Sequence, residues 1–205
     1  MHAPAETLRF ERMTDVLRRT PCTTLWLVAI WVIFFVELIT HAPGNQAMLM
    51  RLGALPVTGI VHGQYWRLLT YALLHSAWWH IGLNTLGLWI CGPVVERALG
   101  PRATLVISVA GAILGGVAIL LVHHNGPASI ELGASGALFA LLGAGLVSTW
   151  RRPGISLSSY RRLRAILIVG LAISFTPEVS MAAHLGGLAS GMALAWMWRA
   201  KAALG

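Results

Sequence analysis

The chain has 205 residues, of which 57% are hydrophobic and only 11% are charged, and its mean hydropathy is +0.72. Soluble domains average about 25% charged residues, so this composition excludes an ordinary soluble domain and indicates an integral membrane protein. The formal net charge of +8 would be compatible with nucleic-acid binding. The positions of the basic residues give this charge a different explanation.

Six apolar segments along the chain are candidate membrane spans. A transmembrane helix needs roughly 20 mostly apolar residues to cross about 30 Å of hydrocarbon. The candidates are residues 23–40, 78–96, 102–122, 135–150, 163–176 and 182–198. We therefore predict an all-α polytopic membrane protein with a six-helix membrane domain over residues 23–199, preceded by a short cytoplasmic segment (1–22) and followed by a cytoplasmic tail (200–205).

The basic residues follow the positive-inside rule. All 15 except Arg51 and Arg67 lie before the first span, between spans two and three or spans four and five or at the adjoining span ends, or after the sixth. With six spans these segments share one side of the membrane, which predicts that both termini are cytoplasmic. The charge excess is then a topology signal, and no nucleic-acid partner is expected.

Four polar residues inside the predicted spans stand out: His80, Asn84, Ser135 and His184. Such residues are costly in a bilayer and mark functional sites. At about 1.5 Å per helical residue, each lies roughly 20–25 Å from the cytoplasmic end of its span. All four are therefore predicted at one level, a few ångströms below the outer face of the membrane.

Ser135 opens the fourth span, in the stretch LGASGALF, and is a candidate nucleophile. A histidine within hydrogen-bond reach can activate a serine hydroxyl, so His184 is the candidate general base. Asp15 is the only aspartate in the chain, and no third triad member is evident. A Ser135–His184 dyad is the simplest assignment.

The same region offers groups that would stabilise an oxyanion. His80 and Asn84 are four residues apart and share a helix face. Each can donate a hydrogen bond, worth about 3 kcal/mol in a water-poor site. Gly133 and Gly136 would leave room for a substrate backbone beside the serine. Gly187 and Gly191 have small-xxx-small spacing, which predicts close packing of the sixth span against a neighbour.

Each of these features also has a structural explanation. Gly-x-Ser-Gly is common in membrane helices, and a lone histidine is more often packed than catalytic. His75 and His80 suggest a metal path, but on a helix five residues separate them by about 140°, which is poor for joint ligation, so no metal is expected. Glu37 can pair with a loop arginine or snorkel. The common depth of the four polar residues favours a catalytic site.

Ordered motifs across the chain from about residue 60 resemble the rhomboid family of intramembrane serine proteases. They are Tyr65-Trp66-Arg67 with Thr70, the His75…His80…Asn84 stretch, Val95-Glu96-Arg97 with Leu99-Gly100, Gly133-Ala134-Ser135-Gly136, and Ala183-His184 followed by Gly187 and Gly191. Each motif alone is weak, whereas the ordered set is specific.

The resemblance implies a six-helix rhomboid-like bundle whose first loop lies partly in the bilayer, in a bacterial plasma (inner) membrane. It implies Ser135 as nucleophile, His184 as base, His80 and Asn84 as oxyanion donors, and no cofactor. Substrates would be single-span membrane proteins. The oligomeric state is not indicated.

Two positions depart from the family pattern, and one alternative function stays open. Phe139 stands where the family often has tyrosine, and its ring is predicted to stack on His184. Tyr71 stands where some members have histidine. The alternative is a non-catalytic rhomboid-like protein that binds membrane clients. Such relatives usually lack the serine or the histidine, and this chain keeps both.

Overall fold

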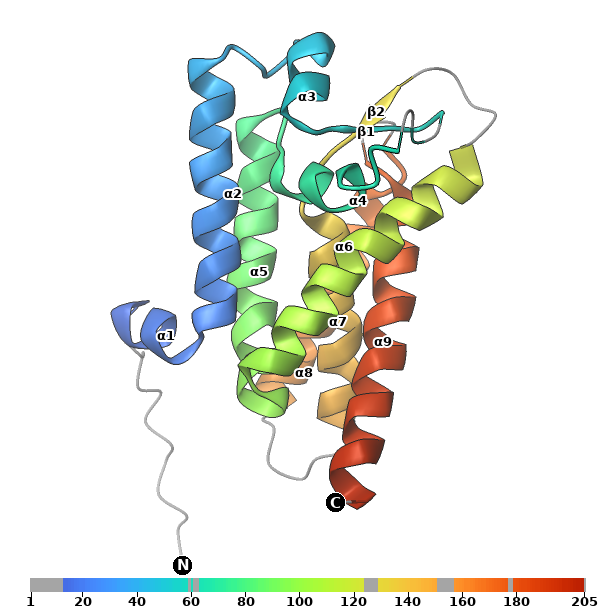
Figure 1. The fold of residues 1–205 in the computed structure, drawn as a ribbon. Helices are drawn as coiled ribbons and strands as arrows, with labels where there is room; N and C mark the ends of the chain where they lie inside the picture. The colour runs from blue at the N-terminus through green and yellow to red at the C-terminus, as the bar shows by residue number, and fades with distance from the viewer. Residues whose placement is uncertain are drawn as a thin grey trace, which may run out of the picture.

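The computed structural model describes residues 13–58, 60, 63–123, 129–150, 157–176 and 179–204. Its helices, shown in Figure 1, are α1 (Met13–Arg19), α2 (Pro21–Ile39), α3 (Gln46–Leu52), α4 (Arg67–Thr70), η1 (Tyr71–Leu73), α5 (Trp78–Leu99), α6 (Pro101–His123), α7 (Ser135–Trp150), α8 (Leu157–Ile173) and α9 (Met181–Leu204). Strands β1 (Leu55–Pro56) and β2 (Ile130–Glu131) form a short antiparallel pair. Residues 1–12 of the predicted N-terminal segment and Gly205 lie outside the described residues.

Helices α2, α5, α6, α7, α8 and α9 fall on the six predicted spans. The largest differences in bounds are at α8, which begins at Leu157 and not near 163, and at α9, which ends at Leu204 and not near 198. Hydropathy detects only the apolar part of a helix, whereas the backbone continues through the turn that carries Arg161 and Arg162. Within the described residues, Pro21–Ile39 and Pro101–Val122 are long and apolar enough to cross a bilayer, and Ser135–Thr149 is a shorter apolar helix.

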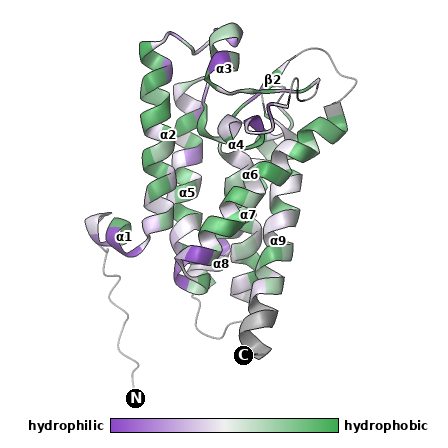
Figure 2. Cartoon of the chain, viewed as in Figure 1, coloured by the Kyte–Doolittle hydropathy of each residue, from purple (hydrophilic) through white to green (hydrophobic). Residues whose placement is uncertain are grey.

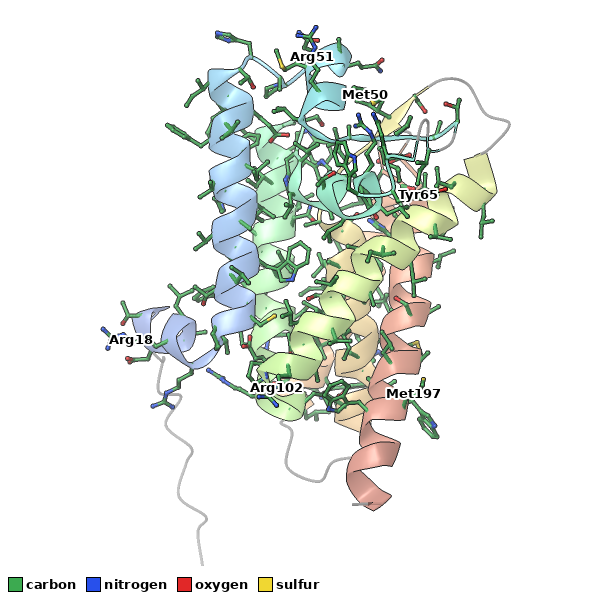
Figure 3. All side chains as sticks on the ribbon, in the orientation of Figure 1. Arg18, Met50, Arg51, Tyr65, Arg102 and Met197 are labelled. Carbon is green, nitrogen blue, oxygen red and sulfur yellow. The ribbon has the colours of Figure 1, made fainter. Side chains whose placement is uncertain are left out.

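Charged and apolar residues separate along the bundle. Figure 2 shows hydrophobic residues along α2 and α6, and hydrophilic residues at α1 and at the neighbouring end of the bundle. Figure 3 places Arg18 and Arg102 at this end and Arg51 at the opposite end. The apolar side chains along the bundle include exposed ones such as Leu25 and Phe35, at 58% and 64%. An apolar exterior of this kind suits a lipid environment.

Helix α7 packs closely against α9. A Cβ atom at Gly187 would overlap the carbonyl group of Gly136, and one at Gly191 would overlap that of Ala140. The neighbour of the sixth span that the glycine spacing predicts is therefore α7. Backbones at this separation gain van der Waals contact that no larger residue would allow.

Helix α5 caps α2 through a buried carboxylate. Glu96 accepts hydrogen bonds from the backbone N–H groups of Cys22 and Thr23, at 2.7 and 2.9 Å, and from the Thr23 hydroxyl at 2.8 Å. The first N–H groups of a helix lack intrahelical partners and carry partial positive charge, which a carboxylate satisfies. This contact fixes the start of α2 against α5.

The long segment between α2 and α5 is held by Arg67. Arg67 is 7% exposed, and its guanidinium donates to the carbonyls of Met50 and Ala54 at 2.7 and 2.8 Å, and to Gln64 Oε1 at 2.7 Å. Burial lowers the pKa of Arg67. The three acceptors belong to different parts of the segment, so one side chain holds together the platform from which α5 begins.

Candidate active site

Ser135 is the first residue of α7, as the sequence predicts. The loop before it is held in place by Gly133, whose N–H donates a hydrogen bond to the Tyr71 carbonyl at 2.9 Å. Gly133 has φ +126°, a left-handed conformation that favours glycine. The serine is half-buried, and it stands at a helix start where first-turn N–H groups lack intrahelical acceptors.

A cavity of about 260 Å³ contains all four predicted polar residues. They come from three helices, with His80 and Asn84 on α5, Ser135 on α7 and His184 on α9. The remaining lining is Trp79, Leu83, Leu86, Gly87, Leu138, Phe139, Ala165, Ile166, Val169, Gly170, Ile173 and Val179. Leu86 on α5 and Val169 on α8 are each 55% exposed, so the cavity reaches the apolar exterior between these helices.

The His184 imidazole is fixed on one face and at one nitrogen. Phe139 stacks on it, with ring centroids 3.9 Å apart and planes 12° from parallel. Nδ1 lies 2.5 Å from the Ser174 hydroxyl. Nε2 is buried and has no hydrogen-bond partner within the described part of the chain. One nitrogen is therefore anchored and the other remains available to a reacting group.

Sequence reasoning missed Ser174. Carboxylates are the usual orienting groups in triads, and a serine in that role is not predicted from residue type alone. The available signal was a serine at the end of span five, ten residues before His184 and across a short connection. Helices joined in this way are antiparallel neighbours, so the two residues had to lie at similar depth.

His80 lies over the loop that precedes the serine. Its ring stacks on Trp79, with centroids 5.4 Å apart, and its Nε2 atom would be 2.6 Å from a Cβ at Gly133. The ring nitrogens make no hydrogen bond to any residue within the described ranges. His80 can therefore donate a hydrogen bond to a group held between it and Ser135.

Asn84 is more constrained than its predicted role requires. Its amide nitrogen donates to the His80 carbonyl and to His75 Nε2, both at 3.2 Å. An amide nitrogen has two hydrogens, so both are already in use. Asn84 lines the cavity, but it can donate to an oxyanion only by exchanging one of these bonds.

His75 precedes α5, so the helical argument that placed it about 140° from His80 does not apply. The two rings are in edge contact, with centroids 5.0 Å apart. Burial, and then His80, lower the pKa of His75 to about 3. The imidazole is neutral at pH 7 and accepts from Asn84. No group of three potential metal ligands occurs within the described ranges.

Glu37 faces the protein interior, does not snorkel, and pairs with no arginine in the part of the chain that the structure describes. It is 0% exposed, and its carboxylate oxygens accept the backbone N–H of His75 at 2.9 and 3.2 Å. This bond joins α2 to the start of α5. It positions the backbone from which His75 and His80 extend.

Comparison of the sequence with known proteins identifies the family of this chain. The Rhomboid domain model matches residues 62–201. The chain belongs to the rhomboid family. Rhomboid protease GluP of Bacillus subtilis is 34% identical over 174 residues, which are 83% of this chain and 34% of that protein. Rhomboid protease GlpG of Enterobacter sp. is 32% identical over 192 residues, which are 92% and 67%. Putative rhomboid protease YdcA of B. subtilis is 28% identical over 195 residues, which are 93% and 94%.

The chain thus spans about a third of GluP, two thirds of GlpG and nearly all of YdcA. Family membership and the apolar helices together make this rhomboid a multi-pass integral membrane protein. The match begins at residue 62, shortly before Arg67, and includes all of the candidate site residues.

Tyr71, one of the departures of this rhomboid from the family pattern, has a structural contact. Its hydroxyl donates to the Ala112 carbonyl of α6 at 2.8 Å, and burial, followed by Glu131, raises its pKa. Gly136 faces this tyrosine and α6, since a Cβ there would lie 3.2 Å from both the Tyr71 hydroxyl and the Gly111 carbonyl. Of the two roles predicted for the glycines, Gly136, Gly187 and Gly191 make the contacts of helix packing, and Gly133 adjoins the site.

Proposed function

We propose that this rhomboid is an intramembrane serine endopeptidase that cleaves single-span membrane proteins through a Ser135–His184 dyad. The observation that supports it most is the shared cavity, in which a half-buried serine and a histidine whose Nε2 has no partner among the described residues lie with His80, a further hydrogen-bond donor. The relatives named as rhomboid proteases support the same reaction class.

In the proposed mechanism, Ser135 Oγ attacks the carbonyl carbon of a substrate peptide bond while His184 Nε2 takes the hydroxyl proton. The oxyanion that forms accepts hydrogen bonds from His80 and from the N–H groups at the start of α7. The C–N bond then breaks as His184 returns the proton to the leaving amine. Water, deprotonated by the same nitrogen, hydrolyses the acyl-enzyme and regenerates the serine.

The lining of the cavity supports a membrane-spanning substrate. Much of its wall is made of aliphatic side chains of α5 and α8, and some of these, such as Leu83 and Val169, are also exposed on the exterior. A substrate helix beside these two helices would exchange lipid for protein without exposing polar groups. We propose entry by this route, with six spans and both termini on the cytoplasmic side, as the basic residues predict.

The test is cleavage in proteoliposomes of a single-span protein with a labelled terminus. The wild-type protein is expected to cleave it, and Ser135→Ala and His184→Ala are expected to lose activity by several powers of ten. Thr85→Val, on α5 away from the dyad, is the matched control for reconstitution. Cleavage that survives in Ser135→Ala would refute the mechanism.

The alternative is a client-binding protein without protease activity. The apolar cavity is as compatible with this function as with a protease, because a helix can bind there without being cleaved. A fluorophosphonate probe separates the two, since it reacts only with an activated serine. Labelling that is lost in Ser135→Ala supports the protease, and absence of labelling in a folded wild-type protein supports the binding protein.

A further inference from the structure

Ser174 lies just after the end of α8 and faces His184 across the short connection to α9. It is 6% exposed and His184 is 3% exposed, so neither side chain has ready access to water. The Ser174 hydroxyl makes two contacts, one with the Gly170 carbonyl at 2.7 Å and one with His184 Nδ1 at 2.5 Å.

Counting hydrogens gives each contact a direction. A hydroxyl has one proton and two lone pairs, and a carbonyl can only accept. The Ser174 proton therefore goes to Gly170, and the Ser174 oxygen accepts the Nδ1–H of His184. The reverse arrangement would leave a proton on Nε2, which is buried without an acceptor among the residues that the structure describes. A buried donor without a partner is costly.

We infer that Ser174 is a positioning residue that holds His184 in the tautomer needed for general-base catalysis. The inference rests on the proposed function and deepens it, since it gives the dyad an orienting group that is not a carboxylate. With Nδ1 protonated toward Ser174, Nε2 keeps its lone pair, on an imidazole that lines the same cavity as Ser135. Triads use an aspartate for the same purpose.

The hydrogen bond also acts during the reaction. When the Ser135 proton moves to Nε2, the imidazole becomes a cation whose Nδ1–H is still bonded to Ser174. No proton moves to Ser174, because its oxygen only accepts. A hydrogen bond to a charged group is stronger than one between neutral groups, so it stabilises the charged state more than the ground state.

The second support for the ring comes from the same turn of α8. A Cβ at Gly170 would lie 2.7 Å from Phe139 Cζ, so the glycine leaves space for the phenyl ring that stacks on His184. Gly170 thus contributes its carbonyl to Ser174 and its missing side chain to Phe139. The Phe139 stack fixes the plane of the imidazole, and the Ser174 hydrogen bond fixes the rotation of the ring within that plane.

The experiment compares Ser174→Ala, Ser174→Thr and the control Ser190→Ala. Ser190 is a buried serine on α9, the helix of His184, and its hydroxyl donates to the Gly187 carbonyl at 2.7 Å without a contact to His184. Ser190→Ala therefore removes a serine-to-backbone bond of the same kind. For each protein we would measure kcat and KM in proteoliposomes, the rate of fluorophosphonate labelling, and the nitrogen-15 spectrum of labelled histidine. His184→Gln identifies the His184 signals by their loss.

Ser174→Ala is expected to lower kcat and the labelling rate by about 10- to 100-fold with little change in KM, the range for loss of a hydrogen bond to a charged group. Its His184 signals should change from one protonated nitrogen to a mixture of both tautomers. Ser174→Thr keeps the hydroxyl and should recover both readouts, and Ser190→Ala should match the wild type.

Wild-type kcat in Ser174→Ala would overturn the inference. So would a slow Ser174→Ala with unchanged His184 signals, or a folded Ser174→Thr that recovers neither readout. A wild-type protein that neither cleaves nor is labelled would refute the proposed function instead. The nitrogen signals report on Ser174 in either case, which keeps the two failures apart.

Discussion

The cavity has two walls that are built in different ways. The wall that carries Ser135 and His184 is formed by α7 and α9, whose backbones touch where Gly187 and Gly191 lie. The wall that carries His80 belongs to α5, and its position depends on hydrogen bonds from the preceding segment, such as that from His75 N–H to Glu37.

This difference in construction predicts how each wall responds to a substitution. Backbone contact leaves no space for added atoms, so the α7–α9 wall should be sensitive to volume. Hydrogen bonds between buried groups are sensitive to loss of a partner, because the remaining partner stays buried and unsatisfied. The α5 wall should therefore tolerate changes of shape better than loss of a polar group.

Outside the Ser135–His184 dyad, the largest effect on activity is expected within the α5 wall, at His80. Loss of one oxyanion donor typically lowers kcat by about 100- to 1,000-fold, and we expect this from His80→Ala. Asn84→Ala should lower kcat only about tenfold, since its amide hydrogens are committed to the His80 carbonyl and to His75. Steady-state kinetics in proteoliposomes measure both.

Thr85→Val, on the same helix, serves as the control for these two variants. Equal losses from His80→Ala and Asn84→Ala would show that Asn84 exchanges its hydrogen bonds during catalysis. The two donors would then be equivalent, and the division of roles within this wall would be wrong.

The largest effect on stability is expected in the α7–α9 wall. In Gly191→Ala, the added methyl group overlaps the backbone of Ala140, which cannot move as a side chain can. Overpacking typically costs 1–3 kcal/mol, and contact with backbone places this variant at roughly 3 kcal/mol or more. Unfolding in detergent measures the loss.

Gly82→Ala on α5 is the matched control, because a Cβ at Gly82 has no neighbour within 4 Å among the residues considered. It should be neutral or slightly stabilising, as alanine is the better helix former. If both variants were equally stable, the glycine contact would not hold this wall.

A smaller effect on stability is expected from the bond that positions the α5 wall. Glu37→Leu leaves the buried N–H of His75 without an acceptor, at a cost of about 1–3 kcal/mol. Glu37→Gln keeps one carbonyl oxygen and should recover most of this loss. Unfolding of the two variants in the same detergent makes the comparison, and equal stabilities would mean that the hydrogen bond contributes little.

The difference between the walls also explains what the sequence could predict. Helix rise alone brought Ser135, His184, His80 and Asn84 to one depth, because their depth depends on spacing within single helices. The side chains and backbone groups that contact these residues depend on the conformation of the connections between helices. The Ser174 contact, the Glu37 contact and the approach of His75 to His80 all involve residues in or beside connections, where periodicity carries no information.

The smallest effect on activity is expected from the ring contact between Phe139 and His184 in the α7–α9 wall. In Phe139→Leu the volume is nearly kept but the flat stack on His184 is lost. Aromatic pairs contribute about 0.5–1.5 kcal/mol beyond burial, so kcat should fall by about twofold to tenfold with KM unchanged.

Phe34→Leu removes another buried ring, which contacts Trp78 far along the chain from the dyad, and should lower stability without lowering kcat. A larger loss in Phe139→Leu than in Ser174→Ala would mean that the ring contact, and not the hydrogen bond, holds His184 in place.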